Sequence, residues 1–144
     1  MATVKGILAV KGGNVISIEP TATLAAAVKT LGENKIGALV VLGPDRRLVG
    51  ILSERDIVRV LAERGASALD EPLAQVMTRK VVTCSQAETI SSIMERMTRG
   101  KFRHVPVVEQ DQVIGIVSIG DVVKYRVQEI EGESAALRDY IQTA

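Results

Sequence analysis

The sequence predicts an α+β protein in which one structural unit occurs twice. Shifting the chain by 66 residues superimposes several segments in the same order, which indicates an internal repeat. The matching segments are 15–18 with 81–84, Thr23-Leu24 with Thr89-Ile90, and, after one residue is dropped from a turn, 50–56 with 115–121. We predict that the two copies span residues 3–64 and 70–130, followed by a C-terminal helical extension over 131–144.

The first helix of each copy is predicted from apolar residues spaced at the helical period. The stripes are Leu24, Val28 and Leu31 in copy 1, and Ile90, Ile93, Met94 and Met97 in copy 2. Gly32 and Asn34 mark the end of the helix in copy 1. Ser85 and Glu88 have the spacing of a capping box, which predicts that the helix of copy 2 begins there.

Each copy also contains two short runs rich in β-branched residues around a turn, which is typical of a hairpin. The runs are 38–42 and 48–52 in copy 1, and 104–108 and 113–117 in copy 2. With an extended segment at its start and a second helix from Ser53 or Ser118, each unit is β-α-β-β-α. Because a unit of about 60 residues is marginally stable alone, we expect the two to pack sheet to sheet with pseudo-two-fold symmetry.

The C-terminal segment from residue 127 to residue 144 has no counterpart in copy 1. Its residues Ile130, Leu137, Tyr140 and Ile141 predict an amphipathic helix. Two interpretations stay open at this point. The helix packs on its own domain, or it forms a dimer contact.

Composition excludes several classes of function. The net charge is +1 and only three residues are aromatic, whereas nucleic-acid binding needs a basic face and stacking side chains. The longest apolar run, 36–42, is too short to span a membrane, and the N-terminus lacks the pattern of a signal peptide. Cys84 is the only cysteine, which excludes an internal disulfide and a Cys-based zinc site. We therefore expect a cytoplasmic protein with no nucleic-acid or membrane partner and no required metal.

The element Gly-Ile-x-Ser-x-x-Asp occurs once in each copy, with Ser53 and Asp56 in the first and Ser118 and Asp121 in the second. It predicts a strand that runs into a helix N-terminus, where free N–H groups can bind an anion. The hydroxyl can donate to a phosphate or sugar oxygen, and the carboxylate can accept from ribose hydroxyls. The same spacing also suits a capping box, in which both side chains bond only to their own backbone. The chain has no phosphate loop, dinucleotide fingerprint or visible acid–base pair, so we expect binding rather than catalysis.

The ordered set of segments resembles a pair of CBS domains over residues 3–130. The resemblance is carried by the two Gly-Ile-x-Ser-x-x-Asp elements together with residues 36–41 and 102–108. It implies a stand-alone regulatory module, commonly a homodimer, that binds adenosine-containing ligands and serves energy or redox sensing. AMP is the first expectation, with ADP, ATP, NAD(H) and S-adenosylmethionine as further candidates, and the regulated target protein stays open. The alternatives are a homodimeric scaffold with degenerate sites and, third, a nucleotide-processing enzyme.

The resemblance also implies two clefts, each joining the Ser-x-x-Asp of one unit to the first strand and hairpin start of the other. The first cleft would contain Ser53, Arg55, Asp56, Lys80, Val82, Phe102, Arg103 and His104. The second would contain Asn14, Ile16, Ile36, Gly37, Ala38, Ser118, Gly120, Asp121 and Lys124. Because Arg binds phosphate through charge-assisted, often bidentate hydrogen bonds, we predict that the first cleft is the better phosphate site. The second cleft is expected to carry less charge, with Lys124 supplying some.

Overall fold

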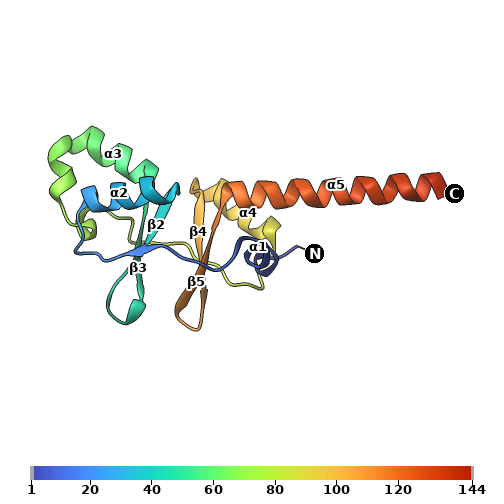
Figure 1. Ribbon diagram of the computed structural model, residues 1–144, viewed down its shortest axis with the longest axis horizontal. Helices are drawn as coiled ribbons and strands as arrows, with labels where there is room; N and C mark the ends of the chain where they lie inside the picture. Colours follow the sequence, from blue (N-terminus) through green and yellow to red (C-terminus); the bar gives the residue numbers. More distant parts are fainter. Residues whose placement is uncertain (1, 144) are drawn as a thin grey trace.

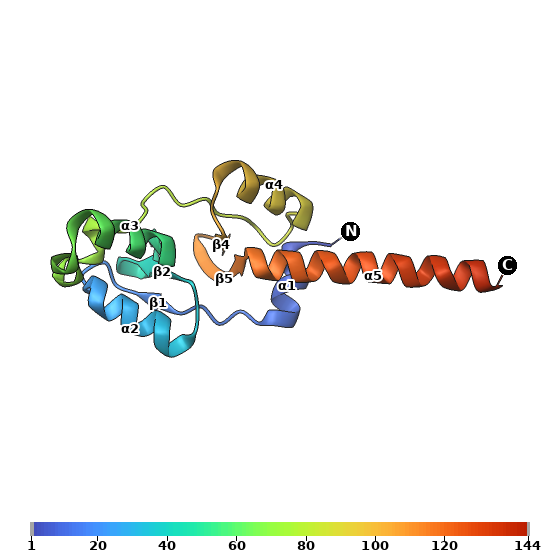
Figure 2. The ribbon, with the colours of Figure 1, turned by 90° about the horizontal axis from the view of Figure 1, so that it is seen from above.

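The computed structural model describes residues 2–143 and contains two α+β units beside each other. In Figure 1 the hairpins of the two units stand next to each other at the centre of the molecule, and the helices lie on the outer sides. Figure 2 shows the same arrangement from above, with one long helix extending away from the second unit. The α+β fold predicted from the duplicated sequence is therefore confirmed.

The first unit contains a three-stranded sheet in the order β1-β2-β3. Its elements are β1 (Ser17–Ile18), α2 (Leu24–Asn34), β2 (Ala38–Leu42), β3 (Leu48–Ser53) and α3 (Glu54–Arg64), with a short 3-10 helix, η1 (Pro44–Arg46), in the hairpin turn. β1 runs parallel to β2, and β2 runs antiparallel to β3 with Val40 opposite Ile51. The predicted hairpin and both predicted helices of this copy are present.

The second unit is built on the hairpin of β4 and β5, in which Pro106 lies opposite Ile116. Its elements are α4 (Ile90–Gly100), β4 (His104–Glu109), β5 (Gln112–Ser118) and α5 (Ile119–Thr143). The strand predicted over 81–84 is reduced to a single bridge between Cys84 and Val107. The next hydrogen bond of the parallel ladder would need the N–H of residue 106, which is a proline and has none.

Two sequence predictions about the helices α4 and α2 need correction. α4 begins at Ile90 with Thr89 as its N-cap, not at the predicted capping box of Ser85 and Glu88. Glu88 does accept a hydrogen bond from the Ser85 N–H at 2.7 Å, but this turn lies before the helix. In α2 the core side includes Ala27, whereas Val28, which belonged to the predicted stripe, is 39% exposed.

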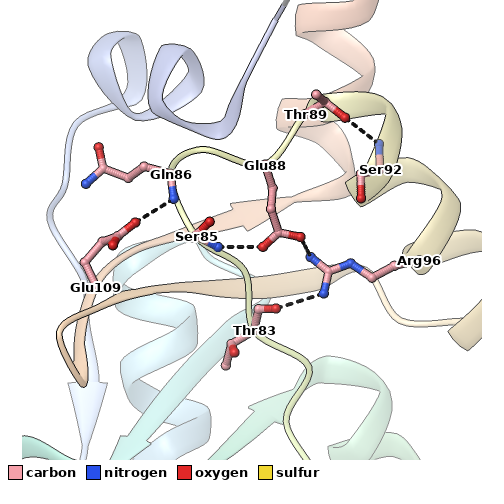
Figure 3. Close-up of polar contacts among 8 residues, drawn as sticks. All are labelled: Thr83, Ser85, Gln86, Glu88, Thr89, Ser92, Arg96 and Glu109. Carbon is pink, nitrogen blue, oxygen red and sulfur yellow. Dashed lines mark hydrogen bonds and ion pairs between the residues drawn. The ribbon is translucent and has the colours of Figure 1, made fainter.

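A polar network anchors the segment that leads into α4 (Figure 3). The guanidinium of Arg96 donates to the Thr83 carbonyl and pairs with the carboxylate of Glu88. The Gln86 N–H donates to the carboxylate of Glu109 on β4 at 2.8 Å. These contacts hold residues 83–88 against α4 and β4 although the segment adds no full strand to the sheet.

The two units exchange their leading segments. α1 (Val4–Lys11) precedes the first unit, but its Val4 and Ile7 are buried in the core of the second. η3 (Leu73–Gln75), which follows η2 (Ala66–Asp70) and precedes the second unit, places Leu73 and Met77 in the core of the first. The predicted boundaries 3–64 and 70–130 therefore delimit the two copies of the repeat in the sequence. They do not delimit the two packed units, because the first segment of each copy packs in the core of the other.

α5 continues without a break from the end of β5 to Thr143. Its first turns pack on the second unit, where Val122 is fully buried. Its distal half projects away from both units in Figures 1 and 2, and Leu137, Tyr140 and Ile141 are exposed. Packing of this half on its own domain, one of the two interpretations of the tail, is therefore wrong; Ala144 lies outside the described residues. No helix within residues 2–143 is long and apolar enough to cross a membrane.

Candidate functional site

Both Ser-x-x-Asp motifs lie where a strand enters a helix, as predicted. The Ser53 hydroxyl accepts from the Asp56 N–H at 3.3 Å, and the Asp56 carboxylate accepts from the Ser53 N–H at 2.9 Å. The corresponding distances between Ser118 and Asp121 are 3.1 and 2.9 Å. Each motif therefore forms a capping box, and the two differ in what else surrounds the carboxylate.

The carboxylate of Asp56 is enclosed by its own protein. Asp56 is 6% exposed and accepts hydrogen bonds from the hydroxyls of Ser53 at 3.0 Å and Thr78 at 3.2 Å. It also forms an ion pair with Arg59 at 3.2 Å. A ligand in the first cleft would have to displace these partners to reach the carboxylate.

The carboxylate of Asp121 has a more accessible setting. Its side chain is 24% exposed and pairs with the ammonium of Lys11 at 2.6 Å. Burial alone would raise the pKa of Asp121, but the hydrogen bond and charge of Lys11, with the bonds from Ser118, outweigh it and lower the pKa. Lys11 also donates to the Ile116 carbonyl at 2.8 Å. Asp121 is thus held ionised beside a cation that a ligand can replace or share.

A cavity of about 290 Å³ lies next to this ion pair, at the junction of the two units. Its lining residues are Lys11, Asn14, Ile16, Lys35, Ile36, Gly37, Ala38, His104, Ile116 and Ser118. Six of the nine residues predicted for the second cleft are among them. Of the other three, Asp121 contacts the lining through Lys11, Gly120 lies in the first turn of α5, and Lys124 is exposed outside the lining.

Two cations line this cleft that the sequence did not predict. Lys11 and Lys35 both line it, although neither was among the predicted site residues. Lys11 is the last residue of α1, which packs on the second unit through the exchange of segments. The residues around Lys11 in the sequence do not predict that it lies in this cleft. Lys35 ends α2 in the left-handed conformation, with φ 54°. The second cleft therefore contains two cations that were not predicted, of which Lys11 is paired with Asp121.

The predicted position of His104 is also corrected. His104 was assigned to the first cleft, but its ring lines the second. A Cβ atom at Gly37 would lie only 3.3 Å from two ring atoms of His104, so the absence of a side chain there makes room for the imidazole. The starts of the two hairpins meet at this point. His104, at the start of the second unit's hairpin, can therefore face the second cleft, which is lined by the start of the first unit's hairpin.

The other residues of the first cleft lie around the start of the second hairpin. Arg55 on α3 donates to the Lys101 carbonyl at 3.1 Å and so links the two units. Lys80, Val82 and Arg103 are exposed, and Phe102 packs against the core of the second unit. A separate hollow of about 550 Å³ lies between residues 17–21 and 42–46 and includes none of the motif residues. Within residues 2–143, no group of three or more His, Cys, Asp or Glu side chains is placed to hold a metal ion.

Comparison with known proteins agrees with the arrangement of two units. The CBS domain family matches residues 7–63 and 73–128. The chain belongs to the CBS domain family. A CBS domain-containing protein of Arabidopsis thaliana, CBSX3, mitochondrial, is 37% identical over 124 residues. This match covers 83% of the present chain and 60% of the Arabidopsis protein, so the chain spans less than two thirds of that relative.

Solved CBS structures share the same fold. The CBS-domain containing protein ATU1752 from Agrobacterium tumefaciens is 46% identical, with a TM-score of 0.84, covering 88% of this chain and 95% of that one. The CBS domain pair of protein MJ0100, in complex with 5′-methylthioadenosine and S-adenosyl-L-methionine, is 26% identical. Its TM-score is 0.80, and the match covers 90% of this chain and 98% of that one. The two CBS units of the present chain are thus arranged as in known CBS pairs.

His104 gives the stability of the CBS pair a predicted pH dependence. Burial lowers the pKa of His104, Lys11 lowers it further, and Glu54 and Asp121 oppose the shift. Because the unfolded chain then takes up the proton more readily than the folded one, the free energy of unfolding should decrease as pH falls below about 6.5, the ordinary histidine value. The loss is complete once pH is below the folded pKa.

Urea unfolding of the wild type and of His104→Gln between pH 7.5 and 5.5 measures this effect. His104 is the only histidine, so the substitution should flatten the dependence of the unfolding free energy on pH in this window. Equal slopes in both proteins would show that the folded imidazole titrates normally.

Proposed function

We propose that this CBS pair is a regulatory module that binds an adenosine-containing ligand, with AMP as the preferred candidate, in the second cleft. The proposal rests chiefly on the 290 Å³ cavity lined by both units. That volume lies near the lower end of the range for small-molecule sites, roughly 300–1,000 Å³. It favours a mononucleotide over a larger dinucleotide of the NAD type.

The lining, together with Asp121 beside it, would supply a partner for each part of such a ligand. The carboxylate of Asp121 would accept hydrogen bonds from ribose hydroxyls while Lys11 turns toward the phosphate. Lys35 would add a second cation for the phosphate, and Ile16 and Ile36 would contact the adenine ring. The complex of the related MJ0100 pair with two adenosine-containing compounds supports this class of ligand.

The first cleft has a weaker case as the principal site, contrary to the expectation from Arg55 and Arg103. Its carboxylate is already bonded to Ser53, Thr78 and Arg59. We assign it a secondary role in ligand binding. A scaffold whose clefts stay empty is the alternative function. The exposed face of α5 offers a surface for a protein contact, which is compatible with ligand binding in the second cleft.

Isothermal titration with AMP, ADP, ATP, NADH, S-adenosylmethionine and adenosine tests the proposal. We expect AMP to bind, and Asp121→Asn to weaken it about tenfold or more, since a hydrogen bond to a charged group contributes roughly 1.5–3 kcal/mol. Lys35→Ala should weaken AMP but leave adenosine, which lacks the phosphate, nearly unchanged. The double variant Arg55→Ala with Arg103→Ala is the matched control in the first cleft and should retain AMP affinity.

Two results would overturn the assignment. Loss of AMP binding in the Arg55 and Arg103 variant, with normal binding in Asp121→Asn, would transfer the site to the first cleft. Failure of the wild type to bind any of the six compounds would favour the scaffold. Mass spectrometry of the denatured purified protein would reveal a ligand that stays bound throughout purification.

A further inference from the structure

The exposed face of α5 carries a regular seam of side chains. Its members, separated alternately by four and three residues, are Val123, Val127, Ile130, Ser134, Leu137 and Ile141. This alternation repeats every seven residues, as do the a and d positions of a coiled coil. The five apolar members are between 46% and 64% exposed. The seam from residue 123 to residue 141 is roughly 27 Å long at a rise of about 1.5 Å per residue.

The protein's own units use a different face of this helix. Val122 is buried, Tyr125 packs against the second core, and the Glu129 side chain is 27% exposed. At about 100° per residue, the centre of the seam lies roughly 130° around the helix from these residues. The seam is therefore turned away from the second unit where α5 is anchored, and it continues along the projecting half.

We propose that this seam pairs with the same helix of a second copy of the chain in a parallel, in-register coiled coil. In such a pair, a g residue of one helix lies near the e residue five positions later in the other. Arg126 would face Glu131 of the second copy, and Glu133 would face Arg138 of the second copy. Both pairs join opposite charges, and each pair occurs twice in the dimer because of its two-fold symmetry.

The opposite orientation is disfavoured by the same charges. An antiparallel pair centred on residue 132 would match Val127 with Leu137 in the seam and bring e residues beside e residues. It would place Lys124 near Arg138 and set Glu131 against Glu131 and Glu133 against Glu133 of the second copy. Like charges in these places are destabilising, so charge selects the parallel arrangement.

Light scattering after size-exclusion chromatography of the full chain tests the seam. The wild type is expected to be a dimer, and Leu137→Glu with Ile141→Glu should shift it to monomer and raise the dissociation constant at least a hundredfold. Ala135→Glu with Ala136→Glu is the matched control, because it adds the same charge to the same turns outside the seam. Unchanged thermal unfolding of either variant at low concentration shows that the two units remain folded.

Orientation is tested by Ser134→Cys in a Cys84→Ser background. A parallel in-register pair brings residue 134 beside residue 134 of the second copy, and mild oxidation should give a covalent dimer. A monomeric wild type, or a seam variant that stays dimeric, would overturn the proposed seam. Dimers that depend on the seam but do not cross-link through residue 134 would overturn the parallel orientation. Pairing through the seam does not require a bound ligand, so these results are independent of the ligand-binding experiments.

Discussion

Leu73→Ala is expected to lower the free energy of unfolding by about 2–5 kcal/mol. Leu73 lies in the connector at the start of the second copy, yet it is fully buried in the core of the first unit. Its N–H also donates to the Ala22 carbonyl at 2.8 Å, which fixes the connector against the segment that leads into α2. Removing the side chain leaves a cavity that the anchored backbone cannot close, and the cost therefore exceeds simple transfer to water.

Urea unfolding followed by circular dichroism measures this change. Val58→Ala is a suitable control because Val58 is 68% exposed on α3 and its truncation should alter the free energy by less than about 0.5 kcal/mol. A cost for Leu73→Ala as small as that of the control would mean that the connector is not part of the first core. A single transition that moves as a whole would show that the exchanged segments couple the two units.

The duplication explains why so much of the fold was predictable. Each hairpin and helix was located twice, and agreement between copies compensates for weak local signals. The start of α4 shows how one copy can correct the other. Thr23 caps α2, and the residue that matches it in the repeat, Thr89, caps α4 in place of the predicted Ser85. The strand at 81–84 is reduced to one bridge because Pro106, on the neighbouring strand, has no N–H to donate to the next rung of the ladder.

The exchange of leading segments was not predictable in the same way. An apolar residue such as Ile7 or Leu73 reveals that it will be buried, but not against which copy. For the same reason, the residues of the candidate site were predicted only in part. Six residues of the second cleft followed from the repeat, whereas Lys11 reaches it only because α1 crosses to the other unit. His104 was assigned to the other cleft because position in the repeat does not determine which way a ring turns at the shared junction.

The two aspartates of the repeated motif should differ sharply when each is replaced by alanine. Asp56→Ala is expected to cost about 2–4 kcal/mol, because it removes a helix cap, typically about 1 kcal/mol, and leaves buried donors without an acceptor at about 1–3 kcal/mol. Among those donors is the hydroxyl of Thr78, on the segment exchanged from the second copy. Asp121→Ala should cost about 1 kcal/mol, since it loses a similar cap and a partly exposed ion pair of small net value.

Chemical unfolding of both variants without ligand makes each aspartate the control for the other, because both lose a capping box. The difference between them therefore isolates the enclosure of Asp56 by Thr78 and Arg59. Equal costs would mean that the two carboxylates have the same structural role, and the enclosure of Asp56 would no longer be a reason to prefer the second cleft. The expected inequality would instead mean that one copy of the motif holds the exchanged connector in place, while the other keeps its carboxylate, paired with Lys11, within reach of a ligand.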